Sequence, residues 1–369
     1  MKILITGARG FIAKNLIVEL NNRGFTDLLL VDKETSDEEL ATYCQKAEFV
    51  FHLAGINRPK TDSEFIEGNV SFTDKLLSFL LKNNNTSSIL LSSSIQAELD
   101  NPYGVSKKAG EELLFNYGKQ NQVRVMIYRF PNVFGKWCQP NYNSVIATFC
   151  HNVTRKKEIT INDPDVIMNL VYIDDVVNEL INALEGNAFQ PTEYCEVPVV
   201  HKQKLGWIAS TLLSFQKSRE NKFVPDMSDE LTKKLYSTYL SYLPETNFSY
   251  DLKMNVDERG SFTEFLKSNS AGQVSINISK PGITKGQHWH HTKNEKFLVV
   301  SGEGVIRFRR VDTEDIIEYH VSGKKLEVVD IPVGYTHNIE NMGDNDMVTV
   351  MWVNEVFDSL KPDTFYLEV

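Results

Sequence analysis

Two groups of residues in this 369-residue chain have the types and spacing that chemistry requires. The first contains Tyr103 and Lys107, which share one face if their segment is helical. A phenol has a pKa near ~10 and is a weak acid–base catalyst at neutral pH, but a neighbouring ammonium favours its phenolate. A serine hydroxyl from the run Ser92, Ser93 and Ser94 would orient and polarise a carbonyl. This set predicts hydride transfer between a nicotinamide and a sugar or alcohol carbon, with Lys107 also binding the nicotinamide ribose.

The second group is a cluster of histidines in the last quarter of the chain. In a strand, His288 and His290 lie on the same face because side chains alternate. Glu295 follows after a short turn, and His337 comes from a later segment. Three imidazoles and a carboxylate suit a divalent metal, with Zn as the expected ion and Fe, Mn, Co or Ni as alternatives.

A glycine-rich turn, residues 6–13, comes between the first expected strand and the first expected helix. Glycine lets the backbone turn sharply and approach a pyrophosphate, and the helix N-terminus adds N–H donors and a positive dipole end. The candidate cofactor-binding residues of this turn are Gly7, Arg9, Gly10, Phe11 and Ile12. The turn predicts a dinucleotide cofactor, because it stands in the strand–turn–helix context that such a site requires.

The end of the second expected strand bears on the choice between NADH and NADPH. Asp32 is placed to bond a ribose 2′-hydroxyl, which favours NAD. Lys33 beside it and Arg9 in the glycine-rich turn are cations that could instead hold a 2′-phosphate. We expect NADPH because of these two cations, of which Arg9 lies in the loop that faces the adenosine ribose. The alternative is that both are solvated surface cations.

These residues need two different scaffolds. Over residues 1–240, short β-branched runs alternate with helical patterns, which indicates βαβ units. After residue 250, apolar and polar residues alternate in single steps, as in Val274, Ile276 and Ile278. We therefore expect an α/β, Rossmann-like, doubly wound parallel sheet in residues 1–245. An all-β domain that closes a barrel or sandwich is expected in residues 246–369.

Composition and charge exclude several classes of protein. The chain is 41% hydrophobic and 24% charged, which rules out a disordered or low-complexity chain. Its net charge is −10 and it has no long Lys/Arg run, so no nucleic-acid partner is expected. No apolar run is long enough to span a membrane, so no membrane partner is expected. The four cysteines are far apart, which favours the reducing cytoplasm as the location.

Residues 1–240 resemble the extended, nucleotide-sugar-modifying branch of the short-chain dehydrogenase/reductase superfamily. Besides the turn, the matching motifs are His52-Leu53-Ala54-Gly55, Asn69, Arg129-Phe130-Pro131-Asn132-Val133-Phe134-Gly135 and Tyr172-Ile173-Asp174-Asp175. The resemblance implies that Ser94, Tyr103 and Lys107 form the catalytic triad, and that His52 lies among the cofactor-binding residues. The chain departs from the family pattern in two ways. Only eight residues separate Ser94 from Tyr103, and Ala13 replaces the third glycine.

Residues 282–341 resemble the cupin family. The matching residues are Gly282, His288, His290, Glu295 and Gly302 in the first motif, and Pro332, Gly334, His337 and Asn341 in the second. The resemblance implies a double-stranded β-helix, or jelly roll, that holds a metal through His288, His290, Glu295 and His337. The alternative is a metal-free cupin whose histidines line a polar pocket.

Residues 257–264, with Gly282 and Gly286, are similar to the sugar-nucleotide 3,5-epimerase branch of cupins. That resemblance implies a histidine base and a lysine that supports an enolate, and Lys296 falls where that lysine would be. The two resemblances give His288 different roles, as a metal ligand and as a base. We expect His288 to be a ligand and Lys296 to be catalytic.

The two sites are chemically coherent on one chain. A C–H bond beside a ketone is acidic because its carbanion is an enolate, so a 4-keto sugar can be epimerised at C3 or C5 and then reduced. In this domain order, the whole chain resembles bifunctional enzymes of capsular polysaccharide precursor synthesis. The resemblance implies that the cupin domain epimerises C3 of a UDP-4-keto-6-deoxy-N-acetylhexosamine. The N-terminal domain would then reduce C4 with NADPH, giving UDP-2-acetamido-2,6-dideoxy-L-talose.

Two alternatives remain. One is a single-activity NADPH-dependent nucleotide-sugar ketoreductase whose cupin domain is non-catalytic and serves binding or dimerisation. The other is a non-catalytic sensor that binds NADP(H) and a metabolite, although the intact Tyr103 and Lys107 pair argues against it. Both superfamilies commonly form dimers, so a homodimer is expected.

Overall fold

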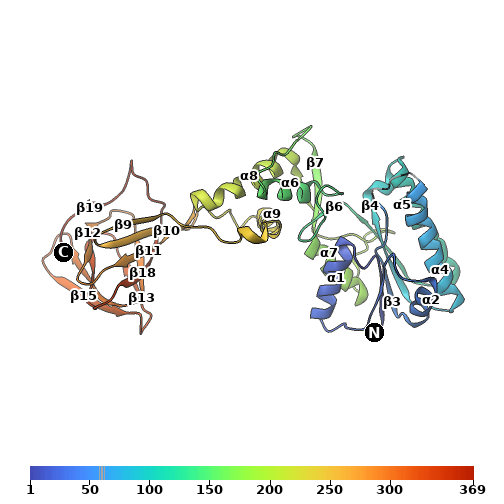
Figure 1. Cartoon of the computed structure of the whole chain (residues 1–369), viewed down its shortest axis with the longest axis horizontal. Coiled ribbons are helices and arrows are strands. Elements are labelled where there is room, and N and C mark those ends of the chain that lie inside the picture. Colours follow the sequence, from blue (N-terminus) through green and yellow to red (C-terminus); the bar gives the residue numbers. More distant parts are fainter. Residues whose placement is uncertain (58, 60, 62) are drawn as a thin grey trace. The chain divides into compact units, whose positions relative to one another are not determined.

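The computed structural model describes residues 1–57, 59, 61 and 63–369, and it divides into two compact units (Figure 1). The first unit comprises Met1–Leu212 and Lys234–Leu243, and the second comprises Leu213–Lys233 and Pro244–Val369. The boundary expected between residues 245 and 246 lies close to the division after Leu243. The structure also groups Leu213–Lys233 with the second unit.

The first unit is built on a five-stranded sheet in the order β2-β1-β3-β4-β5. Its strands are β1 (Ile3–Thr6), β2 (Leu28–Val31), β3 (Phe49–His52), β4 (Ser88–Ser94) and β5 (Val125–Phe130). Every neighbouring pair runs parallel. The strand order reverses between β1 and β3, and in open α/β sheets a ligand binds in the crevice at such a switch point. The doubly wound, Rossmann-like fold expected from the sequence is confirmed.

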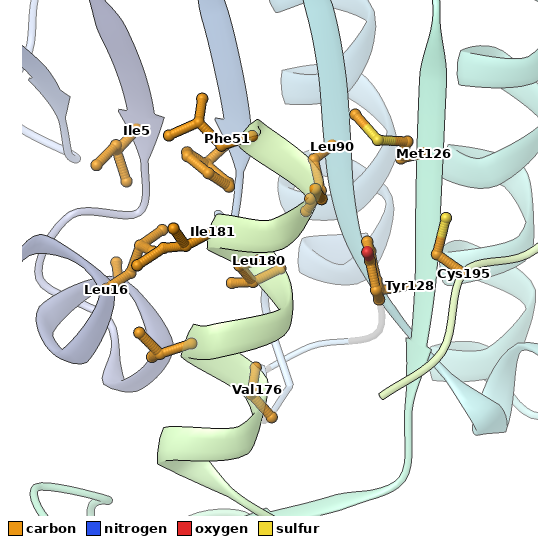
Figure 2. Packing of buried hydrophobic residues seen from close by; sticks show 14 of the residues in the cluster. Ile5, Leu16, Phe51, Leu90, Met126, Tyr128, Val176, Leu180, Ile181 and Cys195 are labelled. Carbon is orange, nitrogen blue, oxygen red and sulfur yellow. The ribbon is translucent and has the colours of Figure 1, made fainter. Parts of the chain in front are cut away.

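Helices cover both faces of this sheet, because its buried strands are apolar on both sides. The covering helices are α1 (Phe11–Asn22), α2 (Asp37–Lys46), α4 (Phe72–Lys82), α5 (Pro102–Asn121) and α7 (Ile173–Leu184). On one face, Leu16 of α1 and Leu180 of α7 pack against Ile5 and Phe51 (Figure 2). The opposite face packs against α2, α4 and α5 through residues that include Val50.

The remaining elements of the chain before residue 248 are short or lie outside the main sheet. They are α3 (Ser63–Ile66), the π-helix η1 (Glu67–Ser71), the 3₁₀-helix η2 (Ile95–Glu98), β6 (Asn132–Phe134), α6 (Val145–Thr154), β7 (Ile167–Tyr172), β8 (His201–Lys204), α8 (Leu205–Asn221), α9 (Glu230–Ser241) and η3 (Glu245–Asn247). Strands β6, β7 and β8 form a separate three-stranded sheet. Helix α8 continues across the division between Leu212 and Leu213.

The second unit consists of two antiparallel sheets. One has the order β16-β13-β18-β11-β10-β9 and the other β15-β14-β17-β12-β19. The strands are β9 (Met254–Asp257), β10 (Gly260–Ser268), β11 (Gly272–Ser279), β12 (Thr284–Trp289), β13 (Glu295–Ser301), β14 (Glu303–Arg310), β15 (Ile316–Ser322), β16 (Val328–Ile331), β17 (Tyr335–Asn341), β18 (Met347–Val353) and β19 (Phe365–Tyr366). Residues from both sheets, such as Phe297 and Ile306, form the core. The expected all-β cupin architecture is confirmed.

Strand β11 reverses the usual burial of an alternating strand. Its polar residues Gln273, Ser275 and Asn277 are the buried ones, each 3% exposed, whereas its apolar residues are only half-buried. Polar groups are buried at a cost unless they meet partners. This strand therefore lines a polar hollow inside the second unit rather than a dry core.

Within the part of the chain that the structure describes, no helix is long and apolar enough to cross a lipid bilayer. Cys44, Cys138, Cys150 and Cys195 are all buried and unpaired. Burial raises the pKa of the Cys44 thiol to about 12, so this thiol stays protonated and unreactive at neutral pH.

Candidate active sites

The glycine-rich turn has the backbone that close approach of a ligand requires. Gly7 has a φ of +68°, and a Cβ added there would lie 2.8 Å from the backbone of Ala54. Gly10 donates from its backbone N–H to the carbonyl oxygen of Gly7 at 2.7 Å. Gly10 is also the N-cap of α1, and no side chain caps that helix within the described residues. The first N–H groups of α1, which begins with Phe11 and Ile12, thus remain available to an anion.

Arg9 projects from this turn towards the end of β2. Its guanidinium pairs with Asp32 at 2.8 Å and with Glu34 at 2.6 Å. Lys33, which lies between those two carboxylates in the chain, is exposed. Arg9, Asp32 and Lys33 were predicted from the sequence, whereas Glu34, which competes with any phosphate for Arg9, was missed.

The side chain of His52 lies inside the core of the first unit and is not exposed to solvent. It is fully buried, with its ring nitrogens 2.7 Å from the Thr6 hydroxyl and 2.9 Å from the Thr73 hydroxyl. Burial lowers the pKa of His52 to about 3, so the imidazole is neutral. Both ring nitrogens join β1, β3 and α4, so the structure gives the His52 side chain a packing role, and its place among the cofactor-binding residues stays a prediction.

Ser94, Tyr103 and Lys107 come together where β4 ends and α5 begins. Burial raises the pKa of Tyr103 to about 12, and a hydrogen bond from Ser94 partly opposes that effect. Burial lowers the pKa of Lys107 to about 8, and its Nζ lies 6.0 Å from the centre of the Tyr103 ring. The structure therefore brings the three predicted residues into one group.

The three consecutive serines have different environments. Ser93 is buried and donates to Glu111 at 2.5 Å, while the carbonyl oxygen of Ser92 accepts a hydrogen bond from Lys107 at 3.0 Å. The Ser94 hydroxyl accepts from the backbone N–H of Gln96 at 3.2 Å, and its interaction with Tyr103 lowers the pKa of that phenol, which favours Ser94 over its neighbours. Glu111, which was not predicted from the sequence, also pairs with Arg129 at 2.6 Å.

Asn69 lies in the π-helix η1 and fastens the loop that follows β3. Its Oδ1 accepts from the backbone N–H of Ile56 at 2.9 Å, and its Nδ2 donates to Ser106 at 3.0 Å. A Cβ on Gly55 would lie 2.9 Å from Asn69 Oδ1 and 3.0 Å from Lys107 Nζ. The absence of a side chain at Gly55 therefore makes room for the ammonium of Lys107. π-Helical turns are frequent at functional sites.

The predicted histidine cluster assembles in the second unit. One ligand atom from each of His288, His290, Glu295 and His337 lies within 4.8 Å of all the others. The carboxylate of Glu295 is 3.3 Å from His337 Nε2 and 3.7 Å from His290 Nε2. A bulge between Gly286 and His288 sets the strand register, which pairs His288 directly with His337 of β17.

The donor atoms of this cluster fit a divalent metal. Nε2 of His290, Oε2 of Glu295 and both ring nitrogens of His337 are buried and lack hydrogen-bond partners among the described residues. Buried polar atoms without partners are costly. Burial and the neighbouring His337 lower the pKa of His288 to about 4. Although burial opposes it, the adjacent imidazoles lower the pKa of Glu295 to about 2. Neutral imidazoles and an ionised carboxylate are the forms that bind metals.

The cluster opens into a cavity of about 690 Å³. Lys285 and Lys293 both line this cavity. Lys285 donates from its Nζ to Asn277 Oδ1 at 2.9 Å. Neither lysine was predicted from the sequence.

Lys296 lies outside this cavity, which corrects its expected catalytic place. Its side chain is 50% exposed and pairs with Asp330. Its strand neighbours Glu295 and Phe297 line the cavity instead. Since adjacent residues of a strand face opposite sides, Lys296 points away from the cavity that Glu295 and Phe297 line.

Comparison with known proteins defines the class. Residues 3–194 match the NAD dependent epimerase/dehydratase family, and residues 255–365 match the polysaccharide biosynthesis C-terminal domain. The chain belongs to the NAD dependent epimerase/dehydratase family and is an enzyme of that family.

The similarity to particular proteins covers the whole chain. The crystal structure of the capsular polysaccharide assembling protein CapF from Staphylococcus aureus is 58% identical, with full coverage of both chains and a TM-score of 0.94. A structure of CapF with the inhibitor 3-isopropenyl-tropolone is 53% identical, with a TM-score of 0.91 and full coverage of both chains. The UDP-2-acetamido-2,6-beta-L-arabino-hexul-4-ose reductase of Pseudomonas aeruginosa is 43% identical, over 100% of this chain and 99% of that protein. The expected resemblance to capsular polysaccharide enzymes is confirmed.

Proposed function

We propose that the chain is a bifunctional nucleotide-sugar enzyme of capsular polysaccharide precursor synthesis. The observation that carries the proposal is the presence of two separate groups of chemically equipped residues on one chain. These are Ser94, Tyr103 and Lys107 in the first unit, and the histidine–glutamate cluster in the second. The substrate is a UDP-4-keto-6-deoxy-N-acetylhexosamine, which is epimerised at C3 and then reduced at C4 to UDP-2-acetamido-2,6-dideoxy-L-talose. The name of the Pseudomonas aeruginosa relative, a reductase of a UDP-linked 4-ulose, supports this substrate class.

In the reduction, the hydride that reaches C4 would be supplied by NADPH. Tyr103 donates its phenolic proton to the developing alkoxide, and Ser94 donates a hydrogen bond to the same oxygen before transfer. With a pKa of about 8, Lys107 is charged at neutral pH and stabilises the phenolate that remains. Gly7, Gly10 and the first turn of α1 hold the pyrophosphate of the dinucleotide. Arg9 would hold the 2′-phosphate in exchange for its present contact with Glu34.

In the epimerisation, the C3 proton is lost to a base in exchange with solvent, and a proton returns to the opposite face of C3. A divalent metal, with Zn as the expected ion, would be held by His288, His290, Glu295 and His337. Such a metal would polarise an oxygen of the keto sugar and would stabilise negative charge there. Lys285 takes the catalytic place that was expected for Lys296. It lines the cavity, and burial lowers the pKa of its ammonium. Lys285 stabilises the enolate oxygen with its remaining ammonium donor, because the other two are directed to Asn277 Oδ1 and to the carbonyl oxygen of Ile278.

The test separates the two activities in the full-length protein. A UDP-4-keto-6-deoxy-N-acetylhexosamine is incubated in D₂O without NADPH, and deuterium at C3 is followed by NMR. We expect exchange in the wild type and in Tyr103→Phe, whereas NADPH oxidation is lost in Tyr103→Phe. Absence of exchange from metal-loaded, folded protein would contradict the epimerase activity alone.

A second candidate is a single-activity NADPH-dependent ketoreductase whose cupin domain is non-catalytic and serves binding or formation of the expected homodimer. It is favoured by the name of the Pseudomonas aeruginosa relative, which describes a reductase only. This candidate predicts full NADPH oxidation with a C3 epimer supplied ready-made, and no deuterium at C3 under any condition.

A further inference from the structure

The last residues of the chain run alongside the histidine cluster. We name residues 362–369 the C-terminal strap. Its strand β19 pairs antiparallel with β12, so that Tyr366 lies opposite His288 and Phe365 lies opposite Trp289. The backbone N–H of Leu367 donates to the carbonyl oxygen of Gln287 at 3.0 Å. The strap therefore closes the edge of the sheet that carries two of the three cluster histidines, His288 and His337.

Asp363 is the most heavily used residue of the strap. Its carboxylate accepts hydrogen bonds from the backbone N–H groups of His291 at 3.1 Å, Thr292 at 2.9 Å and Lys293 at 2.9 Å. The Thr292 hydroxyl donates to the same carboxylate at 3.1 Å. The side chain of Asp363 alone thus holds the turn between His290 and Glu295, which are two of the cluster residues.

The backbone of Asp363 makes a separate contact with the cluster. Nδ1 of His290 lies 2.6 Å from the carbonyl oxygen of Asp363. A carbonyl only accepts, so Nδ1 carries the proton and Nε2 carries the lone pair. Nε2 is the atom that faces Glu295 and lacks a hydrogen-bond partner among the described residues. Asp363 has a φ of +38°, a left-handed conformation that is unfavourable for a non-glycine residue.

We propose that Asp363 is a positioning residue of the metal site: its carboxylate holds the 291–293 turn, and its carbonyl oxygen fixes the tautomer and ring orientation of His290. The proposal rests on the metal site proposed above. Partners on the second nitrogen of a ligating histidine commonly contribute 10–100-fold, as an order of magnitude, to metal affinity. Strain at a left-handed residue persists only where surrounding contacts hold it, and the four hydrogen bonds of the carboxylate are such contacts.

Two further contacts attach the strap near the same site. Lys293, which lines the cavity, donates from its Nζ to the carbonyl oxygen of Pro362 at 2.5 Å. Thr336, next to His337, donates from its hydroxyl to the carbonyl oxygen of Leu367. All four proposed metal ligands are therefore either in a strand paired with the strap, beside a residue that contacts it, or at an end of the turn that it holds.

The test measures metal affinity in the full-length protein. The wild type, Asp363→Ala, Asp363→Asn and the control Tyr366→Phe are stripped with a chelator. Zn²⁺ is then titrated against a chromophoric competitor, and Co²⁺ is added to record its visible absorption spectrum. Tyr366→Phe is the matched control, because it lies in the strap and loses only the exposed hydrogen bond to Glu368.

We expect Asp363→Ala to bind Zn²⁺ ~10–100-fold more weakly and to shift the Co²⁺ spectrum. Asp363→Asn keeps one acceptor oxygen and should recover part of the affinity, which keeps the test decisive if the alanine variant does not fold. Tyr366→Phe should match the wild type. Unchanged affinity and spectrum in both folded Asp363 variants would overturn the role of Asp363. A wild type that takes up neither ion would overturn the metal site itself, and with it this proposal.

Discussion

Lys107 donates a hydrogen bond from its Nζ to the carbonyl oxygen of Ser92 at 3.0 Å. This contact joins the first turns of α5 to the last residues of β4, so the helix that carries Tyr103 is held against the strand that carries Ser94. Burial lowers the pKa of Lys107 to about 8. The ammonium is therefore charged at neutral pH and close to its titration point.

Replacing Tyr103 with Phe removes the proposed proton donor and leaves the ring in place. We predict that NADPH-dependent ketone reduction falls by at least ~10²-fold, the lower end of the usual effect of general acid catalysis. NADPH binding, followed by its fluorescence, should change less than twofold. Reduction retained within tenfold of the wild type would exclude Tyr103 as the acid.

The lowered pKa of Lys107 should also make the free energy of unfolding depend on pH. Its pKa is about 8 in the folded protein, against an ordinary lysine value of 10.5 in the unfolded chain, so between these values the unfolded chain binds more protons. Lys107 therefore lowers the free energy of unfolding at low pH, and this destabilisation decreases as pH rises from 8 to 10.5. At pH 7 we predict that Lys107→Met is more stable than the wild type, by at most about 3 kcal/mol. The difference, measured by urea unfolding at several pH values, should shrink above pH 8; a constant difference would refute the assignment.

Arg9 and Glu34 should tune the choice of cofactor in opposite directions. Arg9→Ala removes the cation proposed to hold the 2′-phosphate. It should raise the KM for NADPH about tenfold and leave the KM for NADH unchanged. Glu34→Gln weakens the 2.6 Å ion pair by which Glu34 competes with that phosphate for Arg9, and it should lower the KM for NADPH. Lys33→Ala is the matched surface control. An equal effect of Arg9→Ala on both cofactors would count against NADPH as the preferred one.

Lys285, which lines the cavity, and Lys296, which lies outside it, give a matched pair of variants. Lys285→Met should slow deuterium exchange at C3 about 10²-fold, as loss of one oxyanion donor typically does. Lys296→Gln should leave exchange within twofold, because Lys296 pairs with Asp330 outside the cavity. Zn²⁺ content is measured in both variants. Loss of exchange in Lys296→Gln with intact metal content would restore Lys296 as the catalytic lysine.

Much of both sites could be predicted because local periodicity and spacing carry it. The i, i+4 relation of Tyr103 and Lys107 holds in α5, and His288 and His290 share a cluster with Glu295. Lys296 lies outside the cavity for a reason visible in the sequence. It follows Glu295 directly in one strand, and adjacent strand residues face opposite sides.

Other features could not be predicted, because their partners are distant in the chain. Both contacts of His52 depend on Thr6 and Thr73, which tertiary packing brings together. Asp363 reaches the 291–293 turn only when β19 joins β12. The polar inward face of β11 was hidden for a different reason. Alternation shows that a strand has two faces, but it does not show which face borders a cavity.

The direct pairing of His288 with His337 has a consequence for folding and for cellular abundance. Strands β13, β14, β15 and β16 lie between them in the chain, so the cluster forms only after non-local pairing, which is slow compared with local structure formation. An ion that binds only the assembled cluster stabilises the folded second unit by mass action. We therefore expect metal starvation to increase proteolysis of the whole polypeptide, and the amount of enzyme in a cell to follow its metal supply even though reduction itself is assigned to the other unit.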